Sequence, residues 1–246
     1  MSAVSVNPDF LEIVEPFVLH HILLHNLSIL VFYMIQIAHR GYSQLYGDNN
    51  MYSFQKALEH GFQMIELDIQ MCSSGHIVVY HDIYIYNEYI SDLPFSELST
   101  YGIISLDQFF SEFAHTDILI FLDIKGKRQI IHEILDIIRK WFVPETMHRI
   151  FISSFDTFII DPILNSNFNV RIGFTTSSSF STNDLDIITQ HCDFVCYHWT
   201  ALDKSTVEYF KEKGILVFSY TCENKFIENH IHKYNVDGIV SNYPII

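Results

Sequence analysis

Positive charge is scarce in this sequence. Among 246 residues, 14 lysines and arginines stand against 29 aspartates and glutamates, which gives a formal net charge of −15 with histidine neutral. A chain this acidic repels the phosphate backbone of nucleic acids, so we expect no nucleic-acid partner. An anionic substrate would need a local cation to offset the charge of the protein, which directs attention to metal ligands.

Cysteine is scarce as well. Four cysteines in a chain of this length exclude a disulfide-stapled scaffold. His191, Cys192, Cys196 and His198 are close enough in sequence to suggest zinc. They lie in an apolar, strand-like run whose alternation places both cysteines on one face, and structural zinc sites usually use closer cysteine pairs in loops. We therefore interpret them as strand residues of a reduced, intracellular protein.

Low-complexity linkers and charge blocks are absent from residues 35–246. Hydrophobic residues make up 49% of the chain and charged residues 17%, so a large core is expected and general disorder is excluded. One large domain fits this length better than two small ones, since α/β barrels commonly run to about 250 residues. We predict one domain over 35–246, preceded by an extension over 1–34.

The extension contains an uncharged stretch, because no Lys, Arg, Asp or Glu occurs from Phe17 to Ala38. The segment before it carries acids and no basic residue, which is the wrong flank for a signal peptide. After its last residues are assigned to a strand, the stretch is at the short limit for a membrane span. His21, His25 and Ser28 share one helical face and leave leucines for burial. We predict an amphipathic helix within 17–33, packed on the domain's base. Membrane-surface contact is the alternative, and cytoplasm is the default location.

Short β-branched or aromatic runs alternate with helix-length segments from residue 35 onward. This alternation predicts parallel strands with crossover helices. The predicted strands are Ile35–His39, Gln63–Gln70, Ile77–His81, Ile118–Lys125, Arg149–Ser154, Val170–Phe174, Phe194–His198, Ile215–Thr221 and Gly238–Ser241. The clearest predicted helices are Ser53–His60, Gln129–Trp141 and Lys204–Lys213.

One connection differs from the others. Only Met71–His76 separates the second strand from the third, which is too short for a crossover and suits a hairpin. Without that hairpin strand eight strands remain, the number that a closed (β/α)8 TIM barrel requires. We predict this α/β barrel with an extra hairpin strand and an N-terminal helix. A doubly wound open sheet is the alternative, but Gly41-Tyr42-Ser43 does not supply its glycine-rich first turn.

Reactive side chains gather at the carboxyl ends of the predicted strands, where the active site of such a barrel lies. The set is His39, Arg40, Glu66, Asp68, His81, Asp82, Asp123 and Lys125. Glu66 and Asp68 are two residues apart, as are Asp123 and Lys125, so each pair projects to one side of its strand.

The acids, histidines and cations of this set suit a metal-dependent reaction. Glu66, Asp68 and Asp123 facing the barrel axis together would repel one another, and a divalent cation is the simplest remedy. Oxygen ligands select Mg²⁺, Ca²⁺ or Mn²⁺ over zinc. Two histidines beside that ion can exchange protons near neutral pH, while Arg40 and Lys125 can hold an anion. Together these groups suit metal-assisted phosphoryl chemistry.

Seven blocks of the sequence resemble motifs of the glycerophosphodiester phosphodiesterase family. They are Ile37-Ala38-His39-Arg40-Gly41, Ile65-Glu66-Leu67-Asp68-Ile69-Gln70, Val78-Val79-Tyr80-His81-Asp82 after Gly75, Leu122-Asp123-Ile124-Lys125, Ile152-Ser153-Ser154-Phe155-Asp156, Val236-Asp237-Gly238-Ile239-Val240 and Tyr243-Pro244. The resemblance covers about residues 35–246. The block from His-Arg-Gly to His-Asp is its most specific part, in both order and spacing.

The resemblance implies a TIM-type barrel that hydrolyses a small glycerophosphodiester to glycerol 3-phosphate and an alcohol. The implied Mg²⁺ or Ca²⁺ ligands are Glu66, Asp68 and Asp123, and the implied phosphate ligands are Arg40 and Lys125. His39 and His81 would serve as general acid and base, in an order that the resemblance leaves open. In the family's usual mechanism the glycerol 2-hydroxyl attacks phosphorus, and water then opens the cyclic intermediate.

The sequence departs from the family pattern at four positions. Asp48 and Asp123 each stand where the family usually has glutamate, and a ligand shifted by about one ångström can cost about 100-fold in rate. Tyr220 replaces a frequent tryptophan, which would alter the pocket, and Asn242 replaces a frequent aspartate. We assign Asp48, Asp82 and Tyr220 to the pocket wall or to the layer behind it.

Three other functions are alternatives to this hydrolase. A phospholipase-D-like relative would attack lysophospholipid or sphingomyelin at a membrane, and the apolar segment 17–33 is the feature that favours it. A degenerate barrel would bind its ligand without turnover, and the shortened acids Asp48 and Asp123 favour that. An aldolase or isomerase barrel has no motif of its own here. The sequence leaves the head group, the cation and the oligomeric state open.

Overall fold

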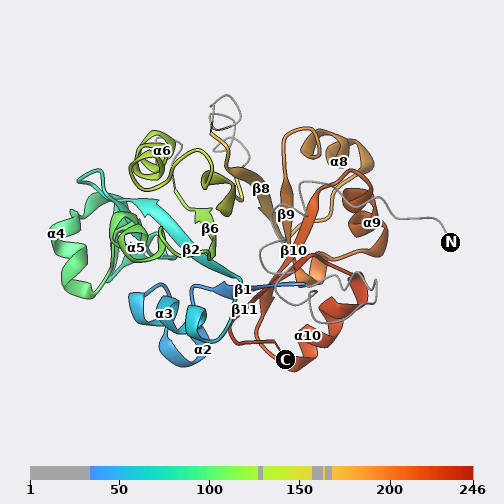
Figure 1. Cartoon of the computed structure of the whole chain (residues 1–246), viewed down its shortest axis with the longest axis horizontal. Coiled ribbons are helices and arrows are strands. Elements are labelled where there is room, and N and C mark those ends of the chain that lie inside the picture. Colours follow the sequence, from blue (N-terminus) through green and yellow to red (C-terminus); the bar gives the residue numbers. More distant parts are fainter. Residues whose placement is uncertain (1–33, 127–129, 157–162, 164–167, 246) are drawn as a thin grey trace.

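Eight parallel strands close into a barrel that helices surround (Figure 1). The computed structural model describes residues 34–126, 130–156, 163 and 168–245. In ring order the strands are β1 (Ile35–His39), β11 (Gly238–Ser241), β10 (Leu216–Cys222), β9 (Phe194–His198), β8 (Arg171–Thr176), β7 (Ile150–Ser154), β6 (Leu119–Ile124) and β2 (Met64–Met71). Because β2 pairs in turn with β1, the ring is closed. The predicted (β/α)8 barrel is confirmed, and the open sheet is rejected.

Two antiparallel hairpins add strands outside the ring. The first is the predicted one, with β3 (Ile77–Val79) antiparallel to β2. The second, β4 (Tyr84–Ile85) with β5 (Glu88–Tyr89), was not predicted. The prediction that the third strand reaches His81 is wrong, because β3 ends at Val79. The Gln70 amide donates hydrogen bonds to the carbonyls of both Tyr80 and Asp82, each at 2.8 Å, and this bends the chain away from the ladder.

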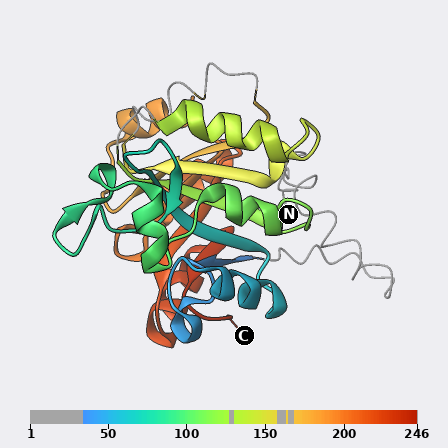
Figure 2. The same ribbon diagram turned by 90° about the vertical axis from the view of Figure 1, so that its left-hand side faces the viewer.

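Helices follow most of the strands and cover the outside of the barrel. They are α2 (Ser43–Tyr46), α3 (Met51–Glu59), α4 (Phe95–Leu98), α5 (Leu106–Phe113), α6 (Ile130–Trp141), α8 (Thr182–Ile188), α9 (Lys204–Glu212) and α10 (Lys225–Ile231). The three helices expected from the sequence correspond to α3, α6 and α9. Figure 2 shows the yellow-green α6 lying above the green α5 along one flank of the sheet.

The barrel interior is filled by aromatic rings. The ring of Phe194 lies 5.3 Å, centroid to centroid, from each of the rings of Phe121, Phe151 and Phe218. The facing position on β8 is Gly173, and a Cβ atom there would collide with the Phe194 ring. Since Phe121 also lines the cavity described below, this packed interior is the floor of the site.

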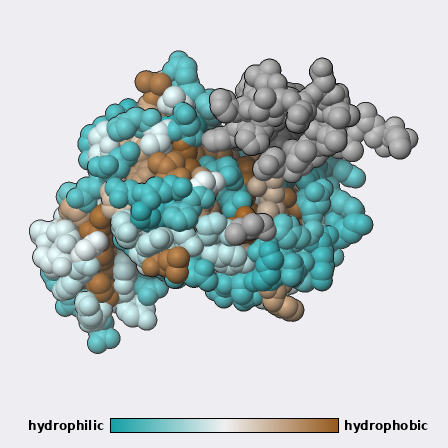
Figure 3. Space-filling view, turned by 60° about the horizontal axis from the view of Figure 1, so that its bottom comes forward, coloured by the Kyte–Doolittle hydropathy of each residue, from teal (hydrophilic) through white to brown (hydrophobic). Residues whose placement is uncertain are grey.

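The N-terminal helix predicted within 17–33, and with it almost all of the 1–34 extension, lies outside the described residues. Among the helices that the structure describes, none is long and apolar enough to cross a membrane. Figure 3 shows a face of the molecule on which hydrophilic side chains predominate and hydrophobic ones form separate patches.

Candidate active site

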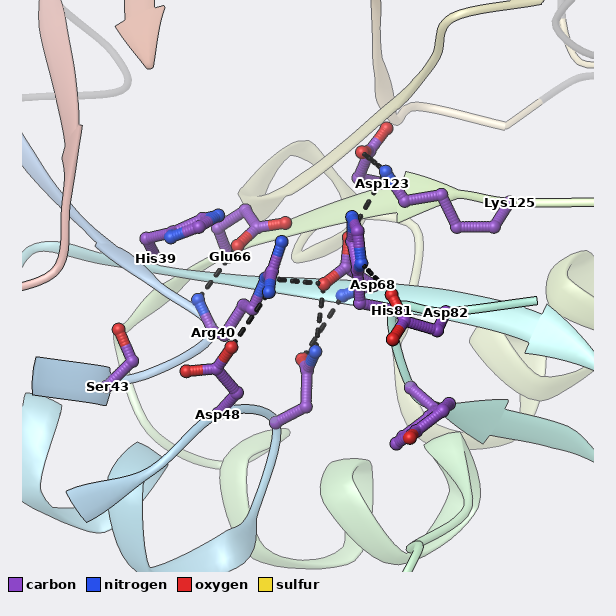
Figure 4. Close-up of polar contacts among 12 residues, drawn as sticks. His39, Arg40, Ser43, Asp48, Glu66, Asp68, His81, Asp82, Asp123 and Lys125 are labelled. Atoms are coloured by element: carbon purple, nitrogen blue, oxygen red, sulfur yellow. Dashed lines mark hydrogen bonds and ion pairs between the residues drawn. The ribbon is translucent and has the colours of Figure 1, made fainter. Parts of the chain in front are cut away.

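A cavity of about 140 Å³ lies at the carboxyl ends of the barrel strands. Eight of the ten residues that the sequence singled out line it: His39, Arg40, Glu66, Asp68, His81, Asp123, Lys125 and Tyr220. Asp48 and Asp82 do not line it, but each bonds to a residue that does. Figure 4 shows the charged and histidine side chains of this set converging on one region from β1, β2, β6 and the bend after β3, and Tyr220 lies on β10.

Three carboxylates form the centre of this site. Glu66, Asp68 and Asp123 are buried, and one ligand oxygen from each lies within 4.8 Å of the others. The parallel register explains the cluster, because Asp68 on β2 pairs with Asp123 on β6. In the part of the chain that the structure describes, no other group of three His, Cys, Asp or Glu side chains is placed to hold a metal. The four cysteines are free thiols, and of the residues predicted to lie in a strand, Cys196 and His198 are in β9 whereas His191 and Cys192 precede it.

Burial and mutual repulsion change the pKa values of these carboxyl groups. Burial, followed by the charges of Asp68 and Asp123, raises the pKa of Glu66 well above its usual value. Burial also raises the pKa of Asp123 to about 6, although Lys125 opposes the rise. For Asp68, burial acts in the same direction, but Lys125 and Arg40 outweigh it and lower the pKa. The cluster is therefore short of positive charge.

Two cations partly neutralise the cluster. Lys125 Nζ lies 2.5 Å from Asp123 Oδ2 and 3.2 Å from Asp68 Oδ1. Arg40 Nε lies 3.0 Å from Asp68 Oδ2, and its Nη1 donates to Asp48 at 2.8 Å. The Arg40 backbone is left-handed, with φ of +56°, and its N–H donates to Glu66 Oε2 at 2.8 Å (Figure 4). Because Arg40 is also paired with Asp48, these two cations neutralise the three clustered carboxylates only in part.

The donor set fits a divalent cation. All three groups offer oxygen, the ligand that Mg²⁺ and Ca²⁺ prefer. Their closeness in a buried site is costly without a cation, as the raised pKa values of Glu66 and Asp123 indicate. These residues could hold such an ion.

The two histidines have different partners. His39 Nδ1 lies 2.6 Å from Asn242 Oδ1, a neutral amide oxygen. Burial, followed by the nearby Arg40 guanidinium, lowers the pKa of His39 to about 4, so the imidazole is neutral at pH 7. His81 is partly exposed, and its Nδ1 lies 2.7 Å from a carboxylate oxygen of Asp82. One histidine thus has an uncharged partner and the other an anionic one.

Several residues of the site are not among those expected from the sequence. Asn49 is buried; its Nδ2 donates to Asp68 Oδ2 at 2.8 Å, and its Oδ1 accepts from the Asp68 N–H at 3.3 Å. Behind Asp123, the Ser153 hydroxyl bonds to that carboxylate at 3.4 Å and to Thr175 at 2.6 Å. The sequence singles out the neighbouring Asp48, but the burial of Asn49 and its φ of +51° are not visible in the sequence.

Comparisons with known proteins agree with this site. The profile of the Glycerophosphoryl diester phosphodiesterase family matches residues 39–246. A glycerophosphodiester phosphodiesterase of Caldanaerobacter subterraneus subsp. tengcongensis is 24% identical over 230 residues, which cover 85% of this chain and 93% of that protein.

Solved structures share the fold. An Oleispira antarctica phosphodiesterase in complex with the product sn-glycerol-3-phosphate superposes with a TM-score of 0.76 at 20% identity, over 85% of this chain and 93% of that one. A Thermotoga maritima glycerophosphodiester phosphodiesterase gives a TM-score of 0.74 at 25% identity, over 85% and 95% of the two chains. The chain therefore belongs to the glycerophosphoryl diester phosphodiesterase family, a family of phosphoric diester hydrolases.

Proposed function

We propose that this protein hydrolyses glycerophosphodiesters to glycerol 3-phosphate and an alcohol, with Mg²⁺ or Ca²⁺ as cofactor. The observation that carries the proposal is one cavity that combines three buried carboxylates, two cationic side chains and two histidines. The Oleispira antarctica relative, which holds sn-glycerol-3-phosphate as product, supports glycerol phosphate as the half of the substrate that this cavity receives.

Glu66, Asp68 and Asp123 would hold the cation, which when bound supplies positive charge opposite the phosphate. Lys125 and Arg40 border the same cavity and would hold the phosphate oxygens. Both side chains are anchored on Asp68, so their charged groups are pre-positioned before substrate arrives. Such fixed charges stabilise developing negative charge without reorganisation in the transition state.

The different partners of the two histidines support an order for the proton transfers. Neutral His39 takes the proton of the glycerol 2-hydroxyl as that oxygen bonds to phosphorus. The bond from phosphorus to the leaving alcohol breaks, and His81 gives that alcohol a proton. Asp82 provides a counter-charge for protonated His81, whereas Asn242 provides none for His39. Water then opens the cyclic phosphate, and both histidines return to their starting states.

The test measures release of glycerol 3-phosphate from glycerophosphocholine and glycerophosphoethanolamine, with Mg²⁺, with Ca²⁺ and with EDTA. We expect turnover that requires a cation and falls about 100- to 10,000-fold in His39→Ala and in His81→Ala. His115→Ala, at an exposed histidine outside the cavity, is the matched control and keeps full activity. No turnover from folded, cation-loaded protein would overturn the proposal.

A phospholipase-D-like activity on lysophospholipids is the second candidate. Ile83, Tyr84 and Tyr86 are 54%, 54% and 77% exposed, in the segment that directly follows His81 and Asp82. Exposed aromatic and aliphatic side chains of this kind suit contact with lipid. The same assay with lysophosphatidylcholine separates the two, since a preference for the deacylated diester would reject the lipid substrate.

A further inference from the structure

Asn242 lies beside His39 because of the strand register. β1 and β11 are paired in parallel with Ala38 opposite Ser241, so His39 and Asn242, the residue that follows β11, are neighbours. The backbone of Asn242 is fixed on both sides. Its N–H donates to the Cys222 carbonyl at 3.1 Å, and its carbonyl accepts from the Gln44 N–H at 3.0 Å. The side chain thus extends from a rigid support.

The hydrogen bonds of this side chain determine which nitrogen of His39 carries the proton. Asn242 Oδ1 has no hydrogen, so in the 2.6 Å contact His39 Nδ1 is the donor. The Ser43 hydroxyl donates to the same oxygen at 3.3 Å, which is consistent with the amide oxygen on this side. A neutral imidazole protonated at Nδ1 carries its lone pair on Nε2. No group of the described residues hydrogen-bonds to that Nε2, while His39 lines the cavity.

An amide differs from a carboxylate at this position. Aspartate would also orient the ring, but its charge would stabilise the protonated imidazole. Asparagine orients the ring without a counter-charge and leaves the imidazole a proton acceptor. The orientation of the ring and the lack of a counter-charge thus both favour acceptance of a proton by His39.

We propose that Asn242 is a positioning residue that holds His39 in its Nδ1–H tautomer and keeps Nε2 free to accept the substrate proton. The catalytic part of this inference rests on the function proposed above. The tautomer itself does not depend on that function, so it can be tested without substrate.

The first test is nitrogen-15 NMR of the imidazole groups, with His39→Ala to assign the His39 signals. In the wild-type protein we expect a single neutral form protonated at Nδ1. Asn242→Ala and Asn242→Ser should give a mixture of the two tautomers, and Ser43→Ala, which leaves Asn242 in place, should not. A wild-type His39 protonated at Nε2, or spectra unchanged in folded Asn242→Ala, would overturn the proposal.

The second test is kinetic. We expect Asn242→Ala to lower kcat about 10- to 100-fold, since a displaced base loses alignment with its proton, while KM changes less than about threefold. Asn242→Asp keeps an oxygen acceptor for Nδ1 but adds a negative charge beside the imidazole, so it should recover only part of that loss. A normal kcat in folded Asn242→Ala would overturn the proposed positioning role. If wild type shows the predicted tautomer but no turnover, the proposed function fails and the tautomer assignment stands.

Discussion

Asp68 shows how much of this site depends on single side chains. Arg40 Nε and Lys125 Nζ approach its two carboxylate oxygens at 3.0 and 3.2 Å, and Asn49 donates to it at 2.8 Å. Asn49 is the one neutral partner among these three. Because it also accepts the Asp68 N–H, it fixes the side chain relative to its own backbone. Such partners behind a metal ligand set the orientation of that ligand.

We predict that Asn49→Ala weakens divalent-cation binding about 10- to 100-fold, because Asp68 loses the hydrogen bond that orients it. Calorimetric titration of metal-free protein with Ca²⁺ and Mg²⁺ measures the change. Asn87→Ala is the matched control, since Asn87 is exposed and also has a positive φ, +71° against +51° for Asn49. Equal affinities in the two variants would show that Asn49 does not orient a metal ligand.

At the scale of elements, α10 is hydrogen-bonded to the segment 242–245, which follows β11 and begins with Asn242. Glu228 of α10 is buried, and its carboxylate accepts from Lys225 Nζ at 2.5 Å and from the Tyr243 hydroxyl at 2.9 Å. Burial acts to raise the pKa of Glu228, but these two hydrogen bonds outweigh it and lower the pKa. The ionised form is therefore stabilised in the folded protein.

This shift predicts a dependence of stability on pH. A carboxyl group with a lowered folded pKa stabilises the protein above its unfolded pKa, about 4.3 for glutamate, and the effect is lost as pH falls through the folded pKa. Glu228→Gln should lower the free energy of unfolding by about 1 to 3 kcal/mol at pH 7, and by progressively less as pH falls below about 4. Urea unfolding at several pH values measures this difference.

Glu112→Gln is the control for that series, because Glu112 is exposed on α5 and its change should cost little at any pH. A constant difference between Glu228→Gln and wild type from pH 7 to pH 3 would contradict the electrostatic explanation. The loss of unfolding free energy would then come from the packing of the Glu228 side chain.

At the scale of the whole molecule, the balance of charge connects stability with function. The chain carries a net charge of −15, and three of its carboxylates are buried together in the barrel. A cation that binds only the folded state relieves this repulsion and stabilises the entire domain. The three carboxylates that the proposed function requires therefore also repel one another in the folded, cation-free protein.

We predict that Mg²⁺ or Ca²⁺ at about 100 times its Kd raises Tm by about 5 to 10 °C, from about 2.7 kcal/mol of binding energy. Thermal unfolding with the cation and with EDTA measures the shift. Asp123→Asn should abolish it, whereas Asp136→Asn, at an exposed aspartate of α6, should keep it. A full shift in Asp123→Asn would place the stabilising cation elsewhere.

The sequence by itself determined the barrel and most of the site. Alternation of strand and helix patterns gave eight ring strands close to their observed bounds, since local periodicity reflects burial on one face. Spacing of two residues placed Glu66 with Asp68 and Asp123 with Lys125 on shared sides of their strands. The carboxylate cluster followed, because parallel strands bring their carboxyl ends to one end of a barrel.

Only the tertiary structure decided how these residues are held. His39 and Asn242 are 203 positions apart in the sequence and are brought together by the β1–β11 register, which no local pattern contains. The bend that takes His81 out of β3 depends on a Gln70 side chain from another strand. The left-handed backbones of Arg40 and Asn49 likewise depend on contacts with β2. Side-chain pairing across the barrel follows from closure of the ring, so it appears only when the chain has folded.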